Sequence, residues 1–118
     1  MEIHTEESCH KAQLAIRDTL DIVGGKWKLV LISVLQNGEK RFNELSREAG
    51  ISPRILSKEL QELEMNGLVS REVCNTKPVT VLYKLTEYSK TLHEVLSAME
   101  KWGAKHRHKI VSEMKKEL

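Results

Sequence analysis

The segment from Lys40 to Thr86 constrains the fold more than any other part of this 118-residue chain. It holds two stretches with apolar residues at helical spacing, separated only by residues 50–52, and then two short runs rich in β-branched residues. A glycine that ends one helix and a serine that begins the next are typical of two helices joined by a tight turn. The order of elements therefore predicts a helix-turn-helix followed by a β-hairpin, or wing.

The two helices of this segment have recognisable ends. The shorter one runs from Asn43, its expected N-cap, to Ala49, and Gly50 terminates it. The longer one spans residues 53–66, because Ser52 is a good N-cap and Pro53 fits the first helical position, where no amide hydrogen is needed. The face that this helix buries would consist of Leu56, Leu60 and Leu63.

The predicted hairpin consists of strands at residues 68–74 and 79–85, joined by a loop at residues 75–78. An isolated two-stranded hairpin is only marginally stable, so we expect it to pack on the helices. Thr86 is the expected cap of a final helical region.

Two further helices are predicted before this segment. Residues 11–23 have apolar side chains at helical spacing and end at Gly24-Gly25. Residues 27–36 are apolar on nearly every face, which is typical of a buried, central helix. Residues 1–10 read as a frayed or partly ordered arm.

The final helical region carries an apolar stripe that continues past Gly103. The stripe could pack within its own chain, or it could form half of a two-fold dimer interface together with the first helix. A compact winged core does not need so long an additional helix, and a surplus apolar stripe tends to find a partner, which favours a homodimer. The residues expected in this interface are Leu92, Leu96, Met99, Trp102 and Ile110.

The charge of the chain limits how it could bind a polyanion. The formal net charge is only +2, and Lys40 to Lys84 contains eight Lys/Arg against six Glu. Bulk charge therefore predicts no general affinity for polyanions, and any nucleic-acid binding must come from a few well-placed cations.

The outward face of the longer helix offers such placed groups. Arginine can donate two hydrogen bonds to guanine, glutamine can pair with adenine, and serine or lysine can reach base edges or phosphates. A solvated helix face is the alternative interpretation, but the preceding short helix and the following hairpin favour DNA. The residues expected to read bases are Arg54, Ser57, Lys58 and Gln61. Those expected to hold phosphates are Arg41, Arg47 and, at the hairpin tip, Lys77, with Arg71 and Lys84 as lesser candidates.

Other functional classes find little support. Cys9 beside His10 could form a redox-sensitive thiol or could be an ordinary terminal cysteine, and Cys74 is less suggestive. The five histidines have no metal-ligand spacing, and no catalytic triad, phosphate loop or carboxylate pair is recognisable, so we expect no metal, no cofactor and no enzyme. No apolar run approaches the ~20 residues of a membrane span and no signal peptide is recognisable, which predicts a cytoplasmic protein.

Several motifs together resemble the HxlR-type winged-helix transcriptional regulators, which are related to the MarR group. The resemblance covers roughly residues 14–103 and is carried by Gly24-Gly25-Lys26-Trp27, by residues 40–45, by residues 60–71 and by residues 83–87. It implies a homodimer that binds double-stranded operator DNA in a sequence-specific way through paired winged helices. The chain would then be one domain over residues 1–118, with an arm at 1–10, dimerisation helices at 11–23 and 87–118, and a DNA-binding unit at 40–86.

Two positions depart from the family pattern. Many members carry a Cys-Pro just before the first helix, which some use as an oxidation sensor, whereas the matching position here falls near Leu14 and Cys9 lies five residues earlier. The usual glycine after Thr-Glu-x is Ser89. The motifs therefore do not identify the effector, which could be an unknown small molecule or an oxidant. The alternative function is a winged-helix protein-interaction module that does not bind DNA.

Overall fold

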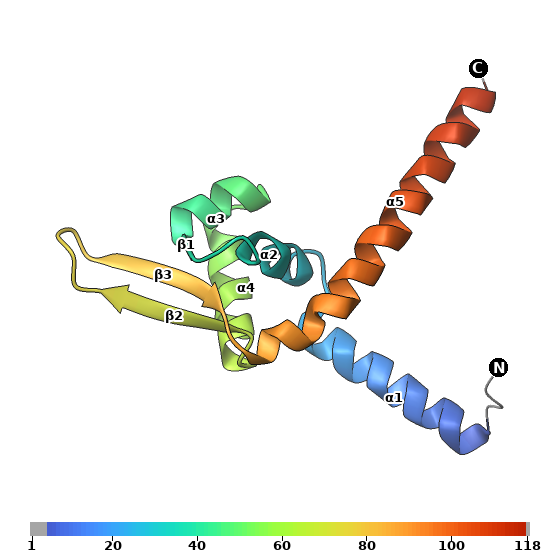
Figure 1. Ribbon diagram of the computed structural model, residues 1–118, viewed down its shortest axis with the longest axis horizontal. Helices are drawn as coiled ribbons and strands as arrows, with labels where there is room; N and C mark the ends of the chain where they lie inside the picture. The colour runs from blue at the N-terminus through green and yellow to red at the C-terminus, as the bar shows by residue number, and fades with distance from the viewer. Residues whose placement is uncertain (1–4, 118) are drawn as a thin grey trace.

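The computed structural model describes residues 5–117 and confirms the predicted class, a mainly α-helical chain with a small antiparallel sheet (Figure 1). In chain order the elements are α1 (Glu6–Val23), α2 (Lys28–Leu35), β1 (Lys40–Arg41), α3 (Phe42–Ala49), α4 (Pro53–Met65), β2 (Val69–Cys74), β3 (Thr80–Leu85), the 3-10 helix η1 (Tyr88–Leu92) and α5 (His93–Lys116). Helices α3 and α4 with the β2–β3 hairpin form the predicted winged helix-turn-helix.

Helix α2 is the central helix of the core, as its nearly uniform apolar sequence predicts. It contacts α3, α4 and β3, and its Leu31 and Ile32 are fully buried. Helix α4 contributes the three leucines that the helical spacing predicts. The other buried apolar residues of this core include Val23, Leu35, Leu45, Ile51, Leu68, Val69, Tyr83 and Leu96.

The sheet has the strand order β1-β3-β2 and is antiparallel throughout. The hairpin register pairs Val69 with Leu85 and Cys74 with Thr80, which leaves residues 75–78 as the predicted loop. Strand β1 was not predicted. It has only two residues, too few to show the alternation by which a strand is recognised in a sequence, and it forms because Lys40 pairs with Tyr83.

The first helix is longer than predicted. It begins at Glu6 because the Thr5 hydroxyl oxygen caps it, accepting a hydrogen bond from the Ser8 amide at 3.1 Å. The prediction of an arm is therefore wrong for residues 6–10, while residues 1–4 lie outside the described part of the chain. Helix α3 also differs from its prediction: Asn43 lies inside it, and the Glu44 carboxylate accepts a hydrogen bond from the Arg41 amide at 3.1 Å.

Two glycines are required by the backbone geometry. At the end of α1, the Leu20 carbonyl oxygen accepts a hydrogen bond from the Gly24 amide at 2.8 Å. A Cβ atom at Gly24 would lie only 2.2 Å from that oxygen. Gly50 ends α3 at φ +69°, in the left-handed region that side chains disfavour. Both positions agree with the predicted ends of the two helices.

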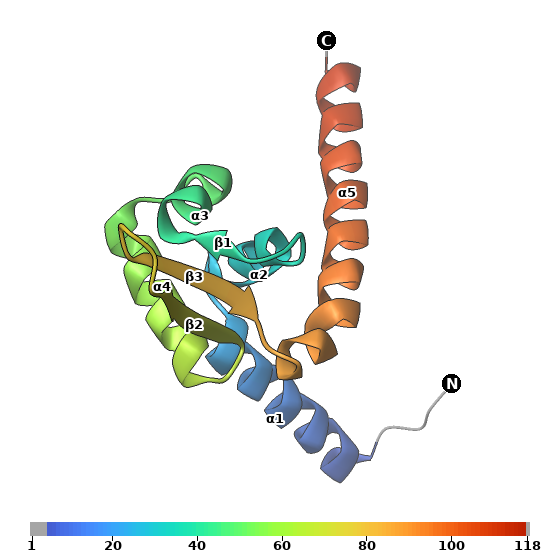
Figure 2. The same cartoon turned by 60° about the vertical axis from the view of Figure 1, so that its left-hand side comes forward.

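The molecule is far from spherical, with principal-axis extents of 58, 48 and 22 Å. Its Cα radius of gyration is 18.1 Å, compared with about 13 Å for a compact domain of 100 residues. The wing extends from one side of the core, and α1 and α5 extend from the other and diverge from each other (Figures 1 and 2). Among residues 5–117, no helix combines the length and apolar character needed to cross a membrane.

Candidate DNA interface

The turn between α3 and α4 is held by three local interactions. The buried Ile51 side chain anchors the turn in the core, and the Ser46 hydroxyl donates a hydrogen bond to the Ile51 carbonyl at 2.7 Å. The Ser52 hydroxyl accepts one from the Ile55 amide at 3.4 Å, which confirms Ser52 as the N-cap of α4. These contacts fix the direction in which α4 leaves the turn.

Helix α4 has one buried and one solvent-facing side. The four residues predicted to read bases are all exposed, whereas the three leucines of the same helix are at most 2% exposed. Positions three or four residues apart in a helix lie on one face. The structure therefore brings the predicted base-reading side chains together as one polar stripe, which consists of Arg54, Ser57, Lys58 and Gln61.

The predicted phosphate-binding residues lie at two places. Arg41 and Arg47 are exposed and line one shallow hollow together with Asn43 and Glu44 at the start of α3. Lys77 is exposed in the loop that joins β2 to β3, at the tip of the wing. Figure 1 shows this tip extending away from the core. The structure thus brings the two arginines together and leaves the lysine separate.

Arg71 belongs with the polar stripe more closely than its sequence position suggests. A hollow of about 410 Å³ lies between α4 and the hairpin, and Ser57, Gln61, Glu64, Arg71 and Tyr83 line it. The alternation of residues in β2 shows only that Arg71 is on an outward side. The packing of the hairpin beside α4 is what places it next to two base-reading candidates.

A partly buried ion cluster lies between α2 and α4. Lys28, the first residue of α2, places its Nζ atom 2.6 Å from Glu59 Oε2 and 2.5 Å from Glu62 Oε2. Burial of the ammonium disfavours its charge, but the hydrogen bonds and charges of the two glutamates outweigh this and raise the pKa of Lys28 above its ordinary value. The hydrogen bond from Lys28 likewise lowers the pKa of Glu62. The one signal of this cluster in the sequence is a lysine in a helix whose other residues, except Ser33, are apolar.

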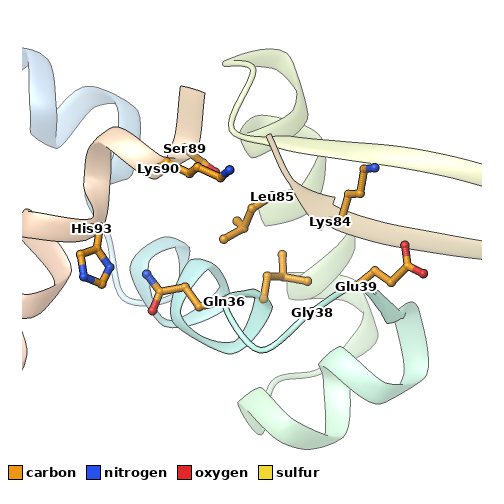
Figure 3. A pocket seen from close by; sticks show the side chains of 9 residues that line it. Gln36, Gly38, Glu39, Lys84, Leu85, Ser89, Lys90 and His93 are labelled. Atoms are coloured by element: carbon orange, nitrogen blue, oxygen red, sulfur yellow. The ribbon is translucent and has the colours of Figure 1, made fainter. Parts of the chain in front are cut away.

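A groove of about 820 Å³ lies where the α2–β1 turn, the end of β3 and the start of α5 meet (Figure 3). Gln36 and His93 lie at one end, Lys84 and Glu39 at the other, and Leu85 between them. Its volume falls in the range of small-molecule sites. The sequence gives no sign of the groove, because its residues come from separate elements.

The residues predicted for a dimer interface have different surroundings. Met99, Trp102 and Ile110 are exposed on α5, and the Trp102 ring stacks on His106 with centroids 5.1 Å apart. Leu92 packs against the core and Leu96 is buried in it, so Leu96 is occupied within its own chain and is not free to meet a partner. Helix α1 adds further exposed apolar side chains, which are Leu14, Ile16 and Leu20.

Among residues 5–117, the cysteines and histidines do not assemble into a further site. Cys9 is exposed on α1, Cys74 is half-buried at the end of β2, and both are free thiols. Within residues 5–117, no group of three His, Cys, Asp or Glu side chains could hold a metal ion. His4 lies outside the described residues.

Known proteins resemble this chain in both sequence and fold. The model of the HxlR-like helix-turn-helix family matches residues 22–111. YdeP of Bacillus subtilis (strain 168), an uncharacterized HTH-type transcriptional regulator, is 44% identical over 96 residues, which are 80% of this chain and 75% of YdeP. The redox regulator HypR in its reduced form superimposes with a TM-score of 0.77 and 41% identity, covering 83% of this chain and 98% of HypR. The HTH-type transcriptional regulator ytcD superimposes with a TM-score of 0.75 and 39% identity, covering 79% of this chain and 96% of ytcD. The chain therefore belongs to the HxlR-like helix-turn-helix family of transcriptional regulators.

Proposed function

We propose that the protein is a cytoplasmic homodimer that binds double-stranded operator DNA in a sequence-specific way and regulates transcription. The observation that carries this proposal is the exposed polar stripe on α4, in a chain of the HxlR-like family that also exposes Arg41, Arg47 and the wing residue Lys77. A polar recognition-helix face flanked by cations is the arrangement by which helix-turn-helix proteins meet the major groove.

In the proposed complex, the exposed polar face of α4 enters the major groove. Arg54 and Gln61 would donate to purine edges, and Ser57 and Lys58 would reach nearby bases or phosphates. Arg41 and Arg47 would hold the phosphate backbone on one side, and Lys77 would reach it from the wing. Because the net charge is only +2, these few cations must supply most of the electrostatic affinity.

Dimerisation would place two α4 helices about 34 Å apart, which matches one turn of DNA. The exposed apolar side chains on α1 and α5 support this part of the proposal. The charges of the two helices are also complementary: α1 carries four Asp/Glu against two Lys/Arg, whereas residues 101–116 carry six Lys/Arg against one Glu. An α1 helix of one copy could therefore pack on α5 of the other.

A mobility-shift titration tests the function directly. The probes are a duplex from upstream of the protein's own coding region and a duplex of the same length and composition with scrambled sequence. We expect tighter binding to the first duplex and a linear fall of log affinity with log salt. Equal affinity for both duplexes would refute sequence specificity, and no binding even at low salt would favour the protein-interaction module instead.

A redox response is the second candidate function. HypR is a redox regulator, and both its reduced and oxidized forms resemble this chain, with 41% and 42% identity. The exposed Cys9 thiol on α1 is the candidate sensor. Treatment with diamide should then weaken operator binding of the wild type and leave Cys9→Ser unaffected. A Cys9→Ser variant that keeps the full response would exclude Cys9.

A further inference from the structure

We propose that Lys28 is a positioning residue for the DNA-reading face, which acts by holding Glu62 away from Lys58. This inference rests on the proposed function, because it assigns Lys28 a role in keeping Lys58 available for DNA. Lys28 itself lies behind α4 and is buried, so it would touch no DNA.

The contacts of Lys28 show how Glu62 is held. The side chain of Lys28 is 11% exposed and that of Glu62 is 39% exposed, and their charged atoms are 2.5 Å apart. Glu59, with a side chain 14% exposed, pairs with the same ammonium group at 2.6 Å. One lysine of α2 thereby draws two carboxylates of α4 toward the flank of the helix that faces α2.

Lys58 is the residue that would otherwise compete for Glu62. It precedes Glu62 by four residues, the spacing at which oppositely charged side chains on a helix meet. Its positive charge already helps to lower the pKa of Glu62, so the two groups lie within electrostatic reach. Yet no ion pair within 4.0 Å joins Lys58 to any carboxylate of residues 5–117. Lys58 therefore keeps its charge free on the exposed stripe.

Loss of the Lys28 charge would change this distribution. Glu62 would lose its closest partner and could turn along the helix surface toward Lys58. The new pair would withdraw a cation from the DNA-facing stripe and place a carboxylate beside it. The geometry thus links a residue of the core helix to the charge of the recognition helix without any movement of the backbone.

The test combines Lys28→Met with Lys58→Met in a double-mutant cycle. Methionine keeps the unbranched shape of lysine and removes its charge. Operator affinity is measured by mobility shift across salt, at a temperature where circular dichroism shows every variant folded. Lys26→Met, which removes the neighbouring exposed lysine, is the matched control.

We expect Lys28→Met to weaken operator binding about fourfold, roughly twofold for each copy of Lys58 that forms an i,i+4 ion pair. In the Lys58→Met background the same change should have no further effect. Adding Glu62→Gln to Lys28→Met should restore the affinity, since the competing carboxylate is then gone. Lys26→Met should bind like the wild type.

Three outcomes would overturn the inference alone: an unchanged affinity of Lys28→Met, an equal loss in both backgrounds, or no rescue by Glu62→Gln. Equal loss without rescue would assign Lys28 a purely structural role in placing α4. Failure of the wild type to bind the duplex would instead overturn the proposed function, and this inference with it.

Discussion

At the scale of single residues, the surroundings of a side chain decide its role more than its chemical type does. Lys28 is buried and shared between two carboxylates, whereas Lys58 is exposed and unpaired among residues 5–117. A buried charge is costly unless it is paired, while an exposed one is available to a ligand. The first therefore organises α4, and the second is a candidate contact with DNA.

Arg54→Ala should weaken operator binding by ~1–3 kcal/mol and relax specificity at one base position, because arginine contributes a bidentate contact to guanine. Binding to a panel of duplexes with single base changes measures both effects. Lys26→Ala, at an exposed lysine between α1 and α2, is the control and should change neither. An equal loss on every duplex would make Arg54 a phosphate contact.

The Lys28 cluster also predicts how stability depends on pH. The pKa of Glu62 is lowered in the folded state, so its contribution is present above its ordinary value of 4.5 and is lost as pH falls through the folded pKa. Urea unfolding of the wild type and of Glu62→Gln between pH 7 and pH 3 measures this contribution. The difference between the two should shrink in acid. A constant difference would show that the ion pair does not stabilise the fold.

At the scale of elements, the position of α4 depends on how its first turn is capped and on how the wing beside it is attached to the core. Its start is fixed by the Ser52 cap and by Pro53 at the first helical position. The wing is attached by the pairing of β1 with β3, and the Thr86 hydroxyl adds a hydrogen bond to the Gly67 carbonyl at 2.6 Å. These contacts join the start of α4 and both ends of the hairpin to the core.

Ser52→Ala should lower the free energy of unfolding by about 1 kcal/mol, because the amides of the first turn of α4 lose their capping oxygen. Ser52→Asp should restore most of the loss, since aspartate also caps. Chemical denaturation measures both variants. An unchanged free energy of unfolding in Ser52→Ala would show that the cap does not stabilise α4.

Lys77→Ala should weaken DNA binding irrespective of sequence and make the slope of log affinity against log salt shallower by about one for each wing. The reason is that one phosphate contact and its released counterion are lost. The same salt titration on the operator and on the scrambled duplex measures this slope. An unchanged slope would remove the wing tip from the interface.

At the scale of the whole molecule, the core accounts for only part of the chain. Helix α5 begins at the core and then extends away from it (Figure 2). Leu96, near its start, is buried, whereas Met99, Trp102, Ile110 and Met114 are exposed. The exposed fraction of Trp102, the largest of these side chains, is 67%. So much apolar surface on one extended helix is typical of an interface between subunits.

Trp102→Glu should therefore convert a dimer into monomers and weaken operator binding, because it places a charge in the proposed apolar interface. Sedimentation equilibrium measures the mass. Met65→Glu, which alters an apolar residue of the winged core that is 85% exposed, is the control and should leave the mass unchanged. A wild type that sediments as a monomer would contradict the dimer.

Local patterns were sufficient for the elements that present the polar stripe. Ser52-Pro53, the three leucines of α4 and the glycines at positions 24 and 50 each act through neighbouring residues, and the structure has the helix ends that they predict within a few residues. Helix α1 begins earlier than predicted, because its cap, Thr5, lies before the stretch with apolar residues at helical spacing. The exposed face of α4, by contrast, follows from the helical spacing of its leucines, so the sequence is sufficient to predict the base-reading stripe.

The sequence by itself determined the winged helix-turn-helix, its family and the exposed face of α4, because helical periodicity and capping depend on residues close together in the chain. Only the tertiary structure decided that Lys28 pairs with Glu59 and Glu62, that Arg71 lies beside the stripe and that Leu96 belongs to the core. Each of these contacts joins residues from different elements. Their distance in space follows from how the helices and the sheet pack, which no local pattern records.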